Sequence, residues 1–312
     1  MFPDRIERLV IDDDLGGLVN DTNKTIQWFL GGCHAAGPEN CAFYASSPTK
    51  IEAALDDIYD SLRSQPLPVF LNSDLYDILT YDDLRSITMV ALYSPSNFPR
   101  LAQKLAELQA GNATTVFELV YVFQYHYIIS GVGSAEAMAA IECGNSDPFN
   151  ADASVEGVYV KNQFNLCRNA GGAVYESLRR MEDSPQASLQ RYKGSLVLCK
   201  PRPALMSKPL TGPVGAANTS HPLLVIGNTA DPATPLAGAK KTSLSFPGSV
   251  LLTQDFPEHS SINTNSTCTH QHVAAYFANG TLPEEGTVCS LDAPLFLTSA
   301  NATVPESPRS AS

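Results

Sequence analysis

The sequence predicts an α/β fold in which a few parallel strands are interrupted by a large, mostly helical insertion. Three short apolar runs, near residues 6–11, 223–226 and 250–253, predict strands, and the last two have the composition of strands that are buried on both faces. A helical pattern separates the last two runs, which gives a strand–helix–strand unit. Between residues 20 and 200, apolar residues recur mainly at helical spacing. We therefore expect a core of about three strands with a helical cap inserted between the first and the second.

The first strand is predicted at the very beginning of the chain. Its apolar run ends in three aspartates and two glycines at residues 12–17, which is how a buried strand meets a loop. Such an element belongs inside a sheet rather than at its start. We therefore expect the chain to begin within its own core.

Boundary signals accompany the helices that are expected next. The first covers residues 20–37 and stops at Gly37-Pro38. Ser47 is the expected N-cap of the second helix, with Pro48 in its first turn. Thr80 through Asp83 form a start like a capping box for the third.

The rest of the insertion is expected to be helical as well. Pro99 opens a helix that Gly111 closes, and further helical segments are expected within 115–130 and near 172–181. A connector rich in proline, glycine and serine follows at about residue 200.

These patterns divide the chain into four parts. We expect a core strand in residues 1–19, a helical cap in 20–205, and a C-terminal core in 206–296. The serine-, proline- and alanine-rich residues 297–312 are expected to be a disordered tail.

Composition excludes several classes of function. The net charge of -12 and the pI near 4.9, without a cluster of lysine or arginine, argue against nucleic-acid binding. No apolar run approaches the roughly 18 residues of a membrane span, so we expect no membrane partner. The first residues also lack the pattern of a secretion signal.

Two features nevertheless favour a secreted protein. Asn-x-Ser/Thr triplets are dense along the chain and occur at Asn20, Asn23, Asn112, Asn218, Asn265, Asn279 and Asn301. The cysteines lack zinc-finger spacing, and disulfides are expected between Cys33 and Cys41 and between Cys268 and Cys289. The remaining cysteines, Cys143, Cys167 and Cys199, would give one more bridge and a leftover thiol, in a pairing that stays open.

The candidate catalytic residues are Asp231 and His259. Each lies in the loop after a predicted apolar strand, where functional groups of parallel sheets gather. An acid and a histidine placed in this way form two parts of a nucleophile–base–acid arrangement, because the carboxylate orients the imidazole and stabilises its protonated form. The alternative is that Asp231-Pro232 merely forms a turn and that His259 is an ordinary surface residue.

Other candidate sites are weaker. His270 and His272 follow Cys268, which suggests a metal site, but residues two apart face different sides of a helix. We expect no metal and no cofactor. Glu142 and Asp147 could contact a substrate ammonium group, although surface or capping roles are the simpler interpretation.

The motifs GNTADPATPL, FPGSVLLTQ, His259 in its serine-rich loop, and AYFANGTLPEEGTVC between Cys268 and Cys289 resemble the C-terminal region of secreted tripeptidyl-aminopeptidase-like α/β-hydrolases. Earlier motifs, MFPDRIERLVID, CHAAGPENCAFY, TYDDLR and ALYSP, are similar to a core strand and the helical cap of the same family. The resemblance runs from residue 1 to about residue 290. It implies that Asp231 is the triad acid and His259 the base.

The sequence departs from the family pattern in two places. Glu258 and Ser260 flank His259, whereas the family usually has glycine before its histidine and often cysteine after it. A carboxylate beside the base either favours the protonated imidazole or points to water. The second departure is that no Gly-x-Ser-x-Gly nucleophile motif occurs. The nearest match, around Ser134, has the wrong spacing, so we expect the nucleophile to lie before residue 1.

The resemblance implies a secreted serine peptidase that releases short peptides from free N-termini through an acyl-enzyme, with the cap closing one end of the cleft. Because the nucleophile and the oxyanion loop are not found in this chain, we expect the chain alone to be inactive. The sequence leaves two alternatives open. One is a peptide-binding protein without catalysis, and the other is an esterase or lipase of the same fold.

Overall fold

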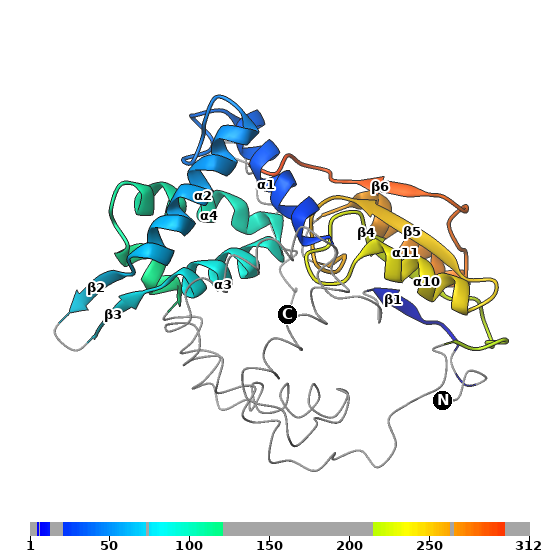
Figure 1. Cartoon of the computed structure of the whole chain (residues 1–312). Helices are drawn as coiled ribbons and strands as arrows, with labels where there is room; N and C mark the ends of the chain where they lie inside the picture. The colour runs from blue at the N-terminus through cyan, green and yellow to red at the C-terminus, as the bar shows by residue number, and fades with distance from the viewer. Residues whose placement is uncertain are drawn as a thin grey trace, which may run out of the picture.

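The computed structural model describes residues 5, 7–12, 21–72, 75–120, 215–262 and 265–296. Within them lies a four-stranded sheet of order β1-β4-β5-β6, with all neighbouring strands parallel (Figure 1). Its strands are β1 (Val10–Asp12), β4 (Leu224–Asn228), β5 (Val250–Asp255) and β6 (Val288–Ser290). The α/β class is confirmed, and the three predicted strands are present. The expectation of about three strands is corrected by β6, a short edge strand in which only Cys289 is buried.

The predicted helices that fall within the described residues are also present. They lie at α1 (Thr22–Ala36), α2 (Pro48–Ser64), α3 (Tyr81–Leu92), α4 (Phe98–Gln109), α10 (Leu236–Ser245) and α11 (Thr267–Asn279), with a short 3-10 helix, η2 (Pro95–Asn97), before α4. The Ser47 side chain caps α2, and Thr80 and Asp83 complete the capping box of α3. Of the helical segment expected within 115–130, residues 115–120 are helical and residues 121–130 lie outside the described residues, as do the helix expected near 172–181, the three remaining cysteines and the tail.

An antiparallel hairpin interrupts the helical insertion. Its strands are β2 (Leu67–Asn72) and β3 (Leu75–Leu79), which project away from the core sheet in Figure 1. The expectation of a mostly helical segment did not include it. Phe70 and Tyr76 are paired across the two strands and are largely exposed, with stacked rings.

Helices cover both faces of the core sheet. Leu224, Ile226 and Leu252 pack with Tyr276 of α11. On the opposite face, α10 comes so close to β4 that a Cβ on Gly227 would lie 2.6 Å from the Cβ of Ala239. Side chains of successive strand residues point to opposite faces, so the two helices flank the sheet from either side. This arrangement fixes both ends of the loop that carries Asp231.

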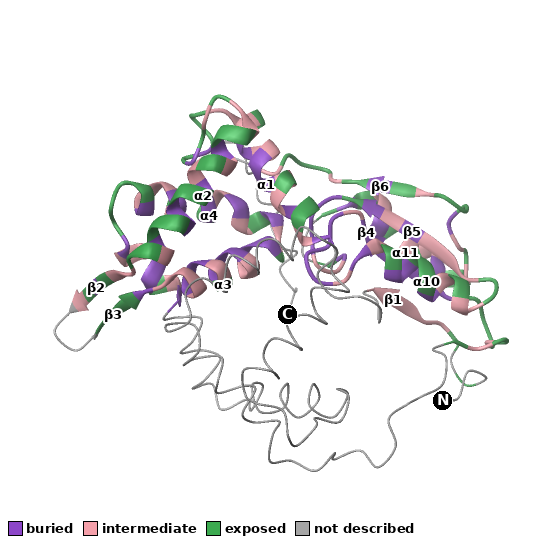
Figure 2. Cartoon of the chain, viewed as in Figure 1, coloured by how far each residue is buried: buried purple, intermediate pink, exposed green. Residues whose placement is uncertain are grey.

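The helical part of the insertion has its own apolar core, seen as the buried faces of α1 to α4 in Figure 2. Phe29 of α1 and Phe98 of α4 meet edge to face at 5.5 Å between ring centroids. Phe296, close to the C-terminal end of the described residues, packs on both rings at 6.1 and 6.3 Å. The segment that follows β6 therefore returns to the insertion and closes its core.

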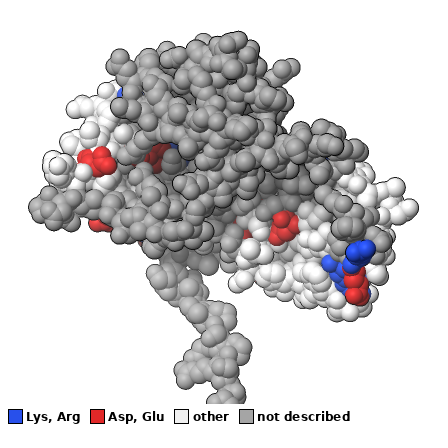
Figure 3. Space-filling model, turned by 90° about the horizontal axis from the view of Figure 1, so that it is seen from below, with Lys and Arg blue, Asp and Glu red and all other residues white. Residues whose placement is uncertain are grey.

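The two expected disulfides are confirmed. Cys33–Cys41 joins the end of α1 to the loop that follows it, and Cys268–Cys289 joins α11 to β6. No helix of the described part of the chain is long and apolar enough to cross a membrane. In the face drawn in Figure 3, the described acidic and basic side chains form small separate spots.

Candidate active site

The acid of the site lies in the loop between β4 and α10. Asp231 is almost fully buried, with 1% of its surface exposed. Its Oδ1 accepts hydrogen bonds from the backbone N–H groups of Ala233 and Thr234, both at 2.7 Å. Its Oδ2 accepts one from the Thr234 hydroxyl at 2.9 Å. The loop thus closes on the carboxylate, as expected for an Asp-x-x-Thr turn, and holds it in one orientation.

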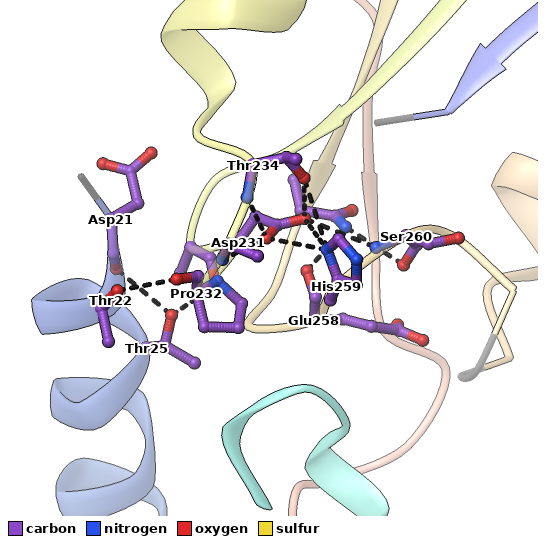
Figure 4. Close-up of polar contacts among 12 residues, drawn as sticks. Asp21, Thr22, Thr25, Asp231, Pro232, Thr234, Glu258, His259 and Ser260 are labelled. Atoms are coloured by element: carbon purple, nitrogen blue, oxygen red, sulfur yellow. Dashed lines mark hydrogen bonds and ion pairs between the residues drawn. The ribbon is translucent and has the colours of Figure 1, made fainter. Parts of the chain in front are cut away.

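The base lies in the loop after β5. His259 Nδ1 is 3.2 Å from Oδ1 and 3.3 Å from Oδ2 of Asp231 (Figure 4). The side chain of His259 is 27% exposed, in contrast to the buried acid. The structure therefore brings together the two residues that the sequence singled out, from loops that follow neighbouring strands.

The contact also defines the tautomer of the neutral imidazole. A carboxylate oxygen only accepts hydrogen bonds, so Nδ1 must carry the proton that points to Asp231. The lone pair is then on Nε2, at the opposite edge of the ring. This is the form that can take a proton from a nucleophile, and the carboxylate can stabilise the positive charge that results.

Two threonines at the start of α1 hold the acid loop. The Thr25 hydroxyl donates to the carbonyl of Ala230, and the Thr22 hydroxyl donates to that of Pro232, both at 2.7 Å. These carbonyls flank Asp231, as Figure 4 shows. The insertion therefore fixes the main chain on both sides of the acid.

Asp21 adds a third hydrogen bond between the insertion and the acid loop. Its Oδ2 accepts a hydrogen bond from the backbone N–H of Leu236, the first residue of α10, at 3.2 Å. Helix α10 has no side-chain cap of its own at this end, so Asp21 acts as its cap from a distant part of the chain.

The insertion also reaches the base. The backbone N–H of His259 donates to the carbonyl of Tyr93 at 3.0 Å, just after α3. The rings of the two residues meet edge to face, with centroids 4.7 Å apart. The cap is therefore bonded to the acid loop through α1 and to the base through Tyr93.

Sequence reasoning missed Thr22, Thr25 and Tyr93 as residues of the site. Tyr93 belongs to the ALYSP motif, which had been noticed only for its family resemblance. The two threonines follow a predicted helix start and gave no signal beyond that. Their role depends on contacts with residues more than 200 positions away, which no local pattern reports.

The structure excludes one of the two alternatives for the carboxylate beside the base. Glu258 does not point to water, because it is fully buried. Its main-chain carbonyl accepts a hydrogen bond from the Asn228 side chain at 2.8 Å. The other candidate acids, Glu142 and Asp147, lie outside the described residues.

The metal alternative meets a chemical obstacle. In the described parts of the chain, one group of side chains has ligand atoms close enough together to hold an ion, namely Cys268, His272 and Cys289. Both sulfurs are joined in a disulfide, so neither is a thiolate that can bind a metal. His270, whose spacing from His272 argues against a shared metal site, is not part of this group.

Comparison with known proteins finds similarity to one family model and to two kinds of curated protein. Residues 184–289 match the TAP-like protein family. Serine protease Hip1 of Mycobacterium tuberculosis and of Mycobacterium bovis are each 27% identical over 216 residues, which is 68% of this chain and 37% of theirs. Carboxylesterase B of Mycobacterium tuberculosis is 27% identical over 223 residues, covering 68% of this chain and 38% of its own.

The chain spans well under half the length of these curated relatives. Its C-terminal part carries a TAP-like α/β-hydrolase domain, and the chain is distantly homologous to serine hydrolases. The predicted resemblance is confirmed at this coarser level.

Proposed function

We propose that this chain is the acid–base part of a secreted serine peptidase of the α/β-hydrolase fold, which cleaves short peptides from substrate N-termini. The observation that carries the proposal is the contact of His259 Nδ1 with the buried carboxylate of Asp231 at 3.2 Å. His259 would take the proton of a serine hydroxyl as that serine attacks the scissile carbonyl, and would then donate it to the leaving amine. Asp231 would stabilise the imidazolium between the two steps.

The nucleophile in this proposal comes from a segment outside the 312 residues. No Gly-x-Ser-x-Gly motif occurs in the sequence. Among the described strands, β1 pairs on one side only, with β4. A parallel strand added at the other edge of β1 would place its carboxyl-end loop at the same edge of the sheet as Asp231 and His259. By this proposal the chain alone forms no acyl-enzyme.

The test is labelling with a fluorophosphonate, a probe that reacts with activated serines. The 312-residue chain is expected to remain unlabelled. A longer protein that supplies a Gly-x-Ser-x-Gly segment upstream is expected to be labelled, and His259→Ala should abolish that labelling. Labelling of a serine in the chain alone, lost in His259→Ala, would contradict the missing nucleophile, and labelling that survives His259→Ala would contradict the base.

A second candidate activity is ester hydrolysis, favoured by the similarity to a protein named carboxylesterase B. The same dyad would serve either reaction, so the substrate decides. We expect the labelled form to cleave a tripeptide anilide with a free N-terminus and to cleave the N-acetylated anilide at least about tenfold more slowly, because losing contacts to a charged ammonium costs about 1.4 kcal/mol or more. Cleavage of simple acyl esters without any cleavage of the anilide would favour the alternative.

The third candidate is a peptide-binding protein without catalysis. It is favoured by the absence of the nucleophile motif from the sequence. It predicts that the chain alone binds a tripeptide with a free N-terminus, which isothermal titration calorimetry would measure. Binding combined with an unlabelled longer protein would support this candidate over the peptidase.

Secretion is part of the proposal and rests on the disulfides and the glycosylation triplets. Every triplet asparagine that the structure describes is exposed, namely Asn23, Asn112, Asn218, Asn265 and Asn279. We expect expression through a eukaryotic secretory pathway to give a protein that loses apparent mass on treatment with an N-glycosidase. An unchanged gel mobility would count against this route.

A further inference from the structure

Ser260, the residue directly after His259, has a strained backbone. Its φ is 68°, and among the residues that the structure describes no other non-glycine residue has a positive φ. Side chains other than glycine rarely adopt this left-handed conformation. A strained backbone conformation persists only where surrounding contacts enforce it, and such conformations are common at functional sites. The contacts that enforce it here come from β1 and β4.

Asn228, the last residue of β4, holds the main chain on both sides of the base. Its side-chain Nδ2 donates to the carbonyl of Glu258 at 2.8 Å and to that of Ser260 at 3.1 Å. The residue is 2% exposed. Because one amide group spans the carbonyls before and after His259, it fixes the direction in which the histidine side chain leaves the loop.

Two further buried side chains set the orientation of that amide. Gln254 lies opposite Asn228 on β5 and donates through Nε2 to Asn228 Oδ1 at 2.7 Å. Thr269 of α11 donates through its hydroxyl to Gln254 Oε1 at 2.5 Å. Carbonyls accept and never donate, so the chain of bonds runs in one direction, from Thr269 to the base loop. A flipped amide at Asn228 would place two acceptors face to face.

Asp12, at the end of β1, holds the loop from the other side. Its Oδ2 accepts hydrogen bonds from the hydroxyl of Ser260 at 3.1 Å and from the backbone N–H of Ser261 at 2.9 Å. The Ser261 hydroxyl donates to the same oxygen at 2.6 Å. A carboxylate that gathers three donors makes strong, charge-assisted bonds.

We propose that Asn228 is a positioning residue for His259, which acts with Asp12 to enforce the strained turn at Ser260 and so keeps Nδ1 of the base on Asp231. The inference deepens the proposed function and rests on it, because the position of His259 matters only if it acts as the base. It assigns a role to a buried amide chain that touches neither the acid nor the imidazole ring. Preorganisation of this kind lowers the reorganisation that catalysis would otherwise require.

The test uses NMR of the 312-residue chain labelled with ¹⁵N in its histidines, so no nucleophile is needed. In the wild type we expect a slowly exchanging Nδ1–H resonance of His259 that disappears in His259→Gln and Asp231→Asn. Asn228→Asp keeps the size of the side chain but removes both donors. We expect the Nδ1–H to exchange with water about tenfold faster in this variant, the factor that corresponds to one lost hydrogen bond.

A matched control comes from the next residue. The Thr229 hydroxyl donates to Asp255 at the same end of the two strands, in an exposed contact that includes neither Asp231 nor His259. Thr229→Ala is therefore expected to keep the wild-type exchange rate. Faster exchange in this control as well would show a general loosening of the strand ends, and would overturn the specific role of Asn228.

Ser260→Gly keeps the proposal testable if Asn228→Asp does not fold. Glycine adopts a φ of 68° without strain, so we expect this variant to melt no lower than the wild type. The variant also loses the hydrogen bond from the Ser260 hydroxyl to Asp12, and its backbone is free to adopt other conformations. The Nδ1–H of His259 should therefore still exchange with water faster than in the wild type. If the contacts of Ser260 served only the stability of the fold, a variant that melts no lower than the wild type would also keep the wild-type exchange rate.

The outcomes separate the two proposals. A wild-type chain without an Asp231-dependent Nδ1–H resonance would overturn the proposed dyad, and the positioning role with it. A wild-type resonance that persists unchanged in folded Asn228→Asp and in Ser260→Gly would overturn the positioning role alone. Faster exchange in both variants, with an unchanged Thr229→Ala control, is the result we expect.

Discussion

Asp231→Asn is expected to lower kcat by about 10⁴-fold in a form of the protein that carries the nucleophile, while leaving the fold intact. The carboxylate position dictates how an asparagine would sit. The backbone N–H groups of Ala233 and Thr234 point at the Oδ1 site, so the amide oxygen would take that place. The amide nitrogen would then occupy the Oδ2 site, which is 3.3 Å from His259 Nδ1.

An amide N–H that faces Nδ1 requires a lone pair there. The imidazole would then carry its proton on Nε2, the wrong tautomer for a base that must accept a proton at that nitrogen. The amide would also lose the negative charge that stabilises the imidazolium. Both effects act on the chemical step, so we expect kcat to fall while KM changes little.

Steady-state kinetics on a peptide anilide would measure the effect, with Asp255→Asn as the matched control. Asp255 lies at the end of the neighbouring strand and accepts a hydrogen bond from Thr229 on the exposed surface. The control is expected to keep wild-type activity. If Asp231→Asn retained more than about a tenth of the wild-type kcat, the effect would be below that of a triad acid and the assignment would be wrong.

The sequence predicted the core of the site because the signals there are local. The run at residues 223–226 is apolar throughout, as strands buried on both faces must be, and the loop after such a strand can be located from the sequence. The capping box of α3 and the two disulfides also follow from short spacings. Once two parallel strands were placed, their carboxyl ends had to meet, which brought Asp231 near His259.

The remaining elements depend on contacts that short spacings do not encode. Strand β6 has three residues and buries only Cys289, too little for an alternating pattern to be recognised. The β2–β3 hairpin carries exposed aromatic residues on a two-stranded sheet within a helical segment, so its pattern favours neither core nor helix. The apolar run ends at residue 226 and so does not include Asn228, whereas its pairing with the buried Gln254 shows that β4 continues to it.

Phe29→Ala is expected to lower the free energy of unfolding by about 3–5 kcal/mol, the usual range for truncating a fully buried phenylalanine. Phe29 is 0% exposed and lies between Phe98 and Phe296, so its loss leaves a cavity bounded by rings from distant parts of the chain. Relaxation into that cavity is limited on one side, because the ring of Phe98 is held in helix α4.

Urea unfolding followed by circular dichroism would measure this loss. Phe70→Ala is the control, since Phe70 is 72% exposed and its removal should cost less than about 1 kcal/mol, the upper range for a cross-strand pair. If both substitutions lowered the free energy of unfolding by the same amount, Phe29 would not be at the centre of this core.

The same change should also reach the acid loop. Phe29 lies one helical turn after Thr25, whose hydroxyl holds the carbonyl of Ala230 beside the acid. If α1 loosens when Phe29 is lost, the Nδ1–H of His259 should exchange faster in the variant that is still folded. The reason is that the carboxylate it points to is held by a loop that depends on α1. An unchanged exchange rate in a destabilised Phe29→Ala chain would mean that the turn after Asp231 suffices to hold the acid without the insertion.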